Sequence, residues 1–295
     1  MTPAPEHIII LLAGLFAIAA LFIISTTLLR RGQQQSNSEL WHVYAFEFLI
    51  VAVVLLPAYL GTGYLLAAIL LFSLRAHREI SKGSGLPFNA LFLSSYVFSS
   101  VLFFTIVIHL LEPHIVQVLL LLSALITSVA FYLTGHKRQR EIWLLFLVLL
   151  SLSCLLAVVD RENGFLLLLF LYIITESNDS FAYLSGKMFG RKKLFPVISP
   201  QKTREGLLGG IIASMIIGLG MNYFFMNMPW LYILLVISAT IVSAVAGDLF
   251  FSVYKRSLGI KDFPAVIKKH GGVLDIYDSL LAASIVYYFL LLSVF

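Results

Sequence analysis

The sequence predicts an all-α integral membrane protein that crosses the bilayer about ten times. Sixty per cent of its 295 residues are hydrophobic and only 12% are charged, and its mean hydropathy is +0.97. A water-soluble domain cannot bury so much apolar surface. Apolar runs of roughly 17–24 residues recur along the whole chain, which is the length that a membrane-spanning helix needs. Lys and Arg gather in alternate connections between these runs, a pattern typical of a polytopic membrane protein.

In chain order, the predicted spans are 7–29, 42–60, 62–80, 88–111, 115–134, 142–159, 164–185, 206–225, 229–250 and 279–294. The first run lacks a basic n-region and a small-residue cleavage site, so we expect a helix rather than a signal peptide. The second and third runs contain Pro57 and a glycine pair at 61 and 63, and a broken hairpin is the alternative there. The lone Cys154 excludes an intrachain disulfide, and we expect it to be a small buried side chain.

The basic residues predict the orientation. Nineteen of the 20 Lys and Arg residues lie in connections that follow odd-numbered spans or, for Arg75 and Arg78, in the last residues of the third span before such a connection. Only Arg161 lies on the opposite side. The positive-inside rule then places the N-terminus outside and the basic connections in the cytoplasm of the cell (inner) membrane. The net charge of +5 therefore reflects topology, and we expect membrane lipids rather than nucleic acid as partners.

Aspartate usage divides the chain. Residues 1–160 form a predicted N-terminal scaffold of lipid-facing helices, and residues 161–295 form the predicted catalytic region. Five of the six aspartates map to the cytoplasmic ends of spans seven, nine and ten or to the connection between the last two: Asp179, Asp248, Asp262, Asp275 and Asp278. Ionisable groups at a membrane span are costly and indicate function. Carboxylates facing the cytosol fit a Mg²⁺ site for a nucleoside triphosphate, with a second cation as an option.

Several of these residues have structural alternatives. Asp275 and Asp278 share one face of the tenth helix if it begins near them, but Asp275 is also a candidate helix cap and Asp278 a candidate partner of the helix dipole. Asp248 is either a metal ligand or an ion-pair partner of Lys255 or Arg256. Two glycines, Gly271 and Gly272, suit a turn that holds phosphate, while His270 either orients a phosphate or caps that turn.

A second polar segment lies before the eighth span. Lys202 and Thr203 stand at its start, where a helix N-terminus and a basic side chain together favour phosphate. Ordinary cytoplasmic basic charge is the alternative reading. We expect Gly206 and Gly210, at small-xxx-small spacing, to mediate helix packing. The chain has no Walker A, HExxH or CxxC motif.

Together these motifs resemble those of the phosphatidate cytidylyltransferases, or CDP-diacylglycerol synthases, over roughly residues 165–295. The matching C-terminal positions are Ser252, Lys255, Arg256, Lys261, Asp262, His270, Gly271, Gly272, Asp275, Asp278 and Ser279. The matching upstream positions are Asp179, Ala182, Tyr183, Gly186, Gly190, Ser199, Pro200, Lys202, Thr203, Glu205 and Gly206.

The resemblance implies transfer of CMP from CTP to phosphatidate at the cytoplasmic face, dependent on Mg²⁺. It implies Asp248 and Asp275 as catalytic metal ligands, with Asp179 and Asp278 as further metal candidates. Lys255 and Arg256 would be catalytic cations. The expected substrate- and phosphate-binding groups are Lys202, Thr203, Lys261, His270, Gly271 and Gly272. A homodimer is one further arrangement that we leave open.

The chain departs from the family pattern at Phe251 (usually Glu), Ile276 (usually Arg), 263–264 (usually Ser-Gly) and 268–269 (usually Pro-Gly). These departures leave two alternatives: the same transfer to another lipid or polyprenyl phosphate, and a catalytically silent homologue that binds or transports lipid. A transporter usually places charges near the bilayer midplane in both halves, whereas here they gather at one face of one half.

Overall fold

The computed structural model describes residues 51–85, 137–265 and 271–292. The chain divides into two compact units, 1–68 and 69–295. Within the first unit, Val51–Leu60 is a short apolar helix. The second unit carries the candidate site, and the description below concerns that unit.

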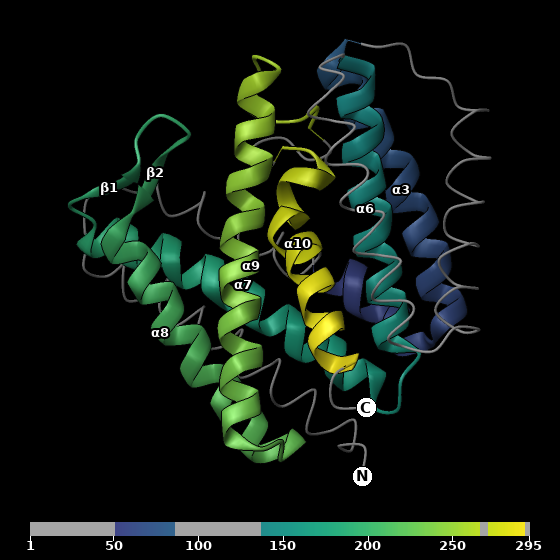
Figure 1. The fold of residues 1–295 in the computed structure, drawn as a ribbon, viewed down its shortest axis with the longest axis vertical. Coiled ribbons are helices and arrows are strands. Elements are labelled where there is room, and N and C mark those ends of the chain that lie inside the picture. Colours follow the sequence, from purple (N-terminus) through teal and green to yellow (C-terminus); the bar gives the residue numbers. More distant parts are fainter. Residues whose placement is uncertain (1–50, 86–136, 266–270, 293–295) are drawn as a thin grey trace, which may run out of the picture. The chain divides into compact units, whose positions relative to one another are not determined.

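The described elements are mainly helices (Figure 1). In chain order they are α3 (Thr62–Ser84), α6 (Lys137–Val159), α7 (Gly164–Phe189), β1 (Lys193–Phe195), β2 (Ser199–Thr203), α8 (Arg204–Met221), the π-helical turn η1 (Asn222–Met226), α9 (Trp230–Ser257) and α10 (Val273–Leu292). Within the described residues, four stretches are long and apolar enough to cross a membrane: α7, α8 with η1, α9, and α10.

Six predicted spans coincide with helices: those at 62–80, 142–159, 164–185, 206–225, 229–250 and 279–294. The predicted spans at 7–29, 88–111 and 115–134, and the first part of 42–60, lie outside the described residues.

The helix ends differ from the prediction where charged residues begin. Helix α9 continues to Ser257 instead of ending at 250, and α10 begins at Val273 instead of 279. With 28 residues, α9 is about 42 Å long, more than the roughly 30 Å hydrocarbon core. A helix need not end where the bilayer ends. The extension places Asp248, Ser252 and Lys255, at i, i+4 and i+7, on one face of one helix.

The predicted all-α fold misses one small sheet. Strands β1 and β2 pair antiparallel, with Lys193 opposite Thr203 and Phe195 opposite Ser199. The sequence analysis treated this stretch as a polar connection because its strands, of 3 and 5 residues, are too short to show an alternating pattern. The hairpin leads directly into α8 and thereby positions Lys202 and Thr203.

Glycines allow α7 and α8 to pack closely. A Cβ at Gly206 would lie 2.6 Å from the Ala182 carbonyl oxygen, and one at Gly210 would lie 2.5 Å from that of Asn178. The predicted packing role of these two glycines is therefore confirmed. Close approach of the two backbones fixes Asp179, which is adjacent to Asn178 on α7.

Helix α10 is embedded among its neighbours. The Tyr287 ring stacks on Phe170 of α7 with centroids 6.3 Å apart, and its hydroxyl donates to the Leu167 carbonyl at 3.0 Å. The Ser284 hydroxyl donates to the Ser151 carbonyl of α6 at 3.1 Å. Cys154 is fully buried, as expected. These contacts hold α10, and with it the polar residues at its start, against α6 and α7.

Candidate active site

Helices α9 and α10 cross where a glycine removes the obstacle of a side chain. A Cβ at Gly247 would overlap the Cβ of Ala282 and lie 3.0 Å from the Asp278 carbonyl oxygen. This close crossing brings Asp248, the next residue on α9, toward Asp278 on α10. The two carboxylates interact electrostatically.

A third carboxylate joins them from α7. Asp179 lies within electrostatic range of both Asp248 and Asp278. We refer to Asp179, Asp248 and Asp278 as the acidic cluster. Asp278 is 6% exposed, whereas the Asp248 side chain is 23% exposed, so the cluster extends from a buried site toward an accessible one.

Two lysines neutralise part of this charge. The Lys202 ammonium on β2 forms an ion pair with Asp248 Oδ2. The Lys255 Nζ on α9 lies 2.6 Å from Asp275 Oδ1, and both side chains are less than 10% exposed. Lys255 also interacts electrostatically with Asp278. The structure thus brings together six predicted site residues from α7, β2, α9 and α10.

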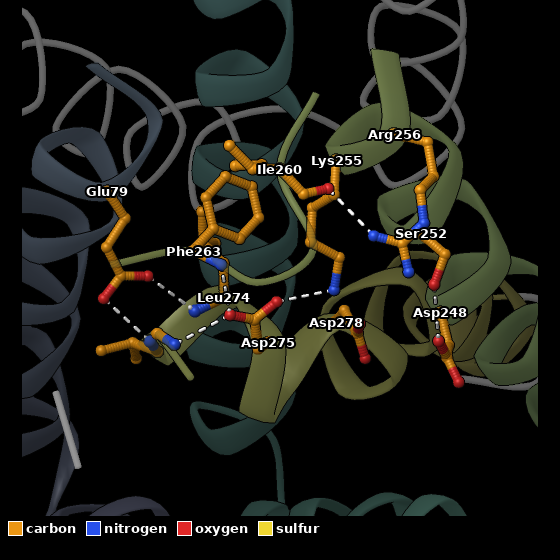
Figure 2. Close-up of polar contacts among 12 residues, drawn as sticks. Glu79, Asp248, Ser252, Lys255, Arg256, Ile260, Phe263, Leu274, Asp275 and Asp278 are labelled. Carbon is orange, nitrogen blue, oxygen red and sulfur yellow. Dashed lines mark hydrogen bonds and ion pairs between the residues drawn. The ribbon is translucent and has the colours of Figure 1, made fainter. Parts of the chain in front are cut away.

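Asp275 organises the backbone at the start of α10 (Figure 2). Its Oδ2 accepts hydrogen bonds from the backbone N–H groups of Gly272 and Phe263, both at 2.8 Å, while Oδ1 accepts from Lys255. The bond from Gly272, the residue before the first helical position, to the third helical residue is one half of a capping box. Asp275 therefore caps the start of α10, as the helix-cap alternative predicted. These bonds use three of the roughly four lone-pair sites of the carboxylate, so a metal ion at Asp275 would compete with Lys255 for Oδ1.

Glu79 on α3 is a site residue that the sequence analysis missed. Its Oε1 accepts from the Val273 N–H at 2.8 Å and its Oε2 accepts from the Leu274 N–H at 3.0 Å. These are the first two amides of α10. Glu79 also pairs with Arg75 one turn earlier at 2.9 Å. The only sign of this role in the sequence is an Arg and a Glu at i, i+4 near the end of a predicted span. The amides that Glu79 binds are almost two hundred residues further along the chain, so the sequence does not identify them.

The remaining predicted residues have other surroundings. Arg256 is exposed and donates to the Ile260 carbonyl at 2.9 Å, near the end of α9 (Figure 2). Lys261 is exposed. The Thr203 hydroxyl is the N-cap of α8 and accepts from the Gly206 N–H at 3.1 Å. His270 lies outside the described residues. Gly271 has φ +78°, a conformation that favours glycine.

The charge balance fits a hard divalent cation. The acidic cluster and Asp275 bring four carboxylates against two ammonium groups, Lys202 and Lys255. Among the described residues, no three His, Cys, Asp or Glu side chains are close enough to form a complete metal cage. Mg²⁺ does not need one, because it usually takes one or two carboxylates, water and substrate phosphate oxygens.

Comparison with known proteins decides the family. A model of the cytidylyltransferase family matches residues 40–294, which is most of the chain and includes every residue of the site. The chain belongs to the cytidylyltransferase family. The family membership extends the resemblance seen in residues 165–295 into the N-terminal half.

Individual relatives agree with this assignment. The chain is 32% identical to the phosphatidate cytidylyltransferase of Aquifex aeolicus over 268 residues, which are 88% of this chain and 95% of the relative. It is 41% identical over 143 residues to that of Haemophilus influenzae, covering 45% of this chain and 49% of the relative. It is also 40% identical over 152 residues to the uncharacterized protein YnbB of Escherichia coli, covering 50% and 51%. These last two matches span about half the length of each relative.

The departures from the family pattern have structural consequences in this chain. Phe251 is 4% exposed and packs edge-to-face against Phe250 at 5.6 Å. A glutamate there would bury a charge. Phe263 is 2% exposed, stacks on Tyr254 at 6.4 Å and lies under the Lys255 ammonium at 5.9 Å. The aromatic ring at 263 therefore covers Lys255 from one side.

Proposed function

We propose that this protein transfers CMP from CTP to phosphatidate, which yields CDP-diacylglycerol and pyrophosphate. One observation carries the proposal within the family: the acidic cluster, Lys202 and Lys255 converge from four elements. This convergence combines ligands for a nucleotide-bound cation with ammonium groups for phosphate.

The reaction needs charge neutralisation more than a protein nucleophile. An anionic phosphate oxygen of the lipid attacks the α-phosphorus of CTP and forms the new P–O bond. The bond between the α-phosphorus and the bridging oxygen breaks, and its electron pair leaves with pyrophosphate. The lipid phosphate is already ionised near neutral pH, so no strong general base is required. The protein's task is to align the two phosphates and offset their charge.

The two lysines and the acidic cluster divide this task. Lys202 and Lys255 are the proposed phosphate-binding groups. Lys202 would exchange Asp248 for phosphate oxygens, whereas Lys255 would stay bound to Asp275 and offer its remaining N–H groups to phosphate. Asp248 is the first proposed metal ligand because its side chain is more accessible than those of Asp275 and Asp278, and Asp179 and Asp278 lie within electrostatic range of it. Bound Mg²⁺ would supply positive charge to the triphosphate. Asp275 is better suited to hold Lys255 and the start of α10 than to bind metal.

The topology of the reaction is part of the proposal. The basic connections predict that the site faces the cytoplasm, where CTP is found. The lipid would enter sideways between helices with its phosphate at this face.

Purified protein in detergent or nanodiscs tests the activity. We expect CTP- and phosphatidate-dependent formation of CDP-diacylglycerol with equal release of pyrophosphate, both lost in EDTA and restored by Mg²⁺. No turnover in the presence of an active family enzyme assayed in parallel would contradict the proposal for phosphatidate.

A second candidate is the same transfer to another lipid or polyprenyl phosphate. It is favoured by the Phe263 ring over Lys255, because this ring replaces a polar family residue beside a proposed phosphate-binding group. It is also favoured by Ile276, half-buried on α10, where the family usually has Arg. Competition among phosphatidate, lysophosphatidate and a polyprenyl phosphate in one assay would rank these acceptors. A chain inactive with all of them would be the silent homologue.

A further inference from the structure

The start of α10 is held by a carboxylate from another helix. Figure 2 shows Glu79 of α3 directed at the backbone around Leu274, with Asp275 on the other side of the same turn. Both Glu79 oxygens accept N–H groups of α10, from Val273 at 2.8 Å and from Leu274 at 3.0 Å. The Glu79 side chain is fully buried.

This contact satisfies two physical requirements at once. The first amides of a helix have no partner within the helix, and an anion at that end interacts favourably with the helix dipole. A buried carboxylate in turn needs hydrogen-bond donors and positive charge. The Arg75 guanidinium supplies charge, since its Nε lies 2.9 Å from Glu79 Oε1. Arg75 also donates to the Pro264 carbonyl at 3.0 Å, so α3 contacts the chain on both sides of the 265–272 connection.

We propose that Glu79 is a positioning residue for nucleotidyl transfer, which acts through Asp275 on the Lys255 ammonium. The path consists of contiguous bonds. Glu79 fixes the first turn of α10, this turn sets Asp275, and Asp275 Oδ1 holds Lys255 Nζ at 2.6 Å. The predicted scaffold half of the chain thereby contributes directly to the geometry of the catalytic half. The turnover measurement depends on the proposed function, whereas the contact between Glu79 and α10 does not.

The two glycines before α10 fit this role without a bound phosphate. A Cβ at Gly272 would overlap the Glu79 carboxyl group and lie 2.8 Å from the Phe263 Cβ, and a Cβ at Gly271 would lie 2.6 Å from Asp275 Oδ2. The absence of side chains at both positions leaves room for the carboxylates of Glu79 and Asp275. Because these carboxylates occupy the amides, the turn is filled by the protein's own anions, and Lys202 and Lys255 remain the proposed phosphate-binding groups.

The test compares Glu79→Gln with wild type and with Glu162→Gln, a control carboxylate that is exposed in the connection between α6 and α7. The glutamine keeps the size of the side chain but turns an NH₂ group toward one of the two backbone donors. Hydrogen exchange of peptides covering 272–276 measures the amide contacts directly. Turnover with CTP and phosphatidate measures the consequence for the site.

We expect protection of the Val273 and Leu274 amides to be lost in Glu79→Gln, with turnover reduced about tenfold or more and normal insertion and monodispersity. Glu162→Gln should match wild type in both measurements. If the path runs through Asp275, adding Glu79→Gln to Asp275→Asn should reduce turnover by much less than it does in wild type.

Unchanged turnover in Glu79→Gln, or additive losses in the double variant, would overturn the positioning role. If the variant fails to purify, hydrogen exchange of the wild-type protein tests the contact by itself. Fast exchange of the Val273 and Leu274 amides would contradict their hydrogen bonds to Glu79 and overturn the proposal. If wild-type protein shows no turnover at all, the proposed function fails, whereas the exchange comparison still tests whether Glu79 holds α10.

Discussion

At the scale of single residues, the two aspartates Asp248 and Asp275 have different partners in this site. Asp248 pairs through Oδ2 with the partly exposed Lys202, and its Oδ1 has a contact of 3.4 Å with the Ser252 hydroxyl. Asp275 accepts three bonds of 2.6–2.8 Å from buried or backbone groups. A cation can therefore reach Asp248 by displacing one lysine, whereas Asp275 would lose bonds that hold the fold together.

This difference predicts separate effects of two matched substitutions. Asp248→Asn removes a proposed metal ligand, so the Mg²⁺ concentration for half-maximal turnover should rise about tenfold or more. Asp275→Asn should lower kcat while that Mg²⁺ concentration stays close to wild type, because the asparagine loosens Lys255 and the turn. Mg²⁺ titrations of the three proteins measure both quantities. A larger Mg²⁺ shift in Asp275→Asn than in Asp248→Asn would restore Asp275 as the metal ligand.

Sequence patterns located the residues of the acidic cluster but not their supports. Aspartates that gather at one end of three spans indicate a shared site, since such charges are costly at a membrane. Glu79 shows no such pattern. Its function depends on the spatial proximity of α3 and α10, which spacing along the chain does not contain. Arg256 is adjacent to Lys255 in sequence, but on a helix successive side chains point about 100° apart, and its catalytic role stays a prediction.

At the scale of elements, the length of the apolar runs predicted which segments are helices. The predicted helix ends were wrong where charged residues were taken to end a helix. The six described helices at predicted spans are set by hydrophobicity, whereas α9 continues past Lys255 and Arg256 because those side chains end the apolar run without breaking the helix. The hairpin of β1 and β2 was missed for a related reason: local pairing of short polar strands leaves little hydrophobic pattern.

The packing of α7 on α8 provides a stability prediction with an internal control. Gly206→Ala adds a methyl group 2.6 Å from the Ala182 carbonyl oxygen, whereas at Gly220, also on α8, a Cβ meets nothing within 4 Å. Overpacking costs typically about 1–3 kcal/mol, so Gly206→Ala should lower the thermal midpoint while Gly220→Ala should not. Fluorescence-detected size-exclusion chromatography after heating measures both. Equal midpoints for the two variants would contradict close packing at Gly206.

At the scale of the whole molecule, the division into an N-terminal scaffold and a C-terminal catalytic region needs a qualification. The acidic cluster and both lysines do lie in the C-terminal part. Residues of α3 nevertheless contact the start of α10, and the family match begins at residue 40. The two parts are therefore joined at the site by hydrogen bonds as well as by chain connectivity.

Membrane orientation, which follows from the basic connections, is the prediction with the widest consequence, because it decides whether the site meets cytosolic CTP. Cys154 is the only cysteine and is fully buried, so Cys154→Ala provides a background without thiols. In that background, Glu162→Cys reports the connection between α6 and α7, and Val197→Cys reports the tip of the hairpin, where the side chain is 89% exposed. If the positive-inside pattern holds, a membrane-impermeant maleimide should label Cys at 162 in intact spheroplasts and Cys at 197 only after the membrane is opened.

Helix α7 separates the two positions, so labelling of both from the outside would contradict its crossing of the membrane. The reverse pattern would place Lys202 and the acidic cluster on the outer face, where CTP is absent, and would therefore remove the proposed reaction as well.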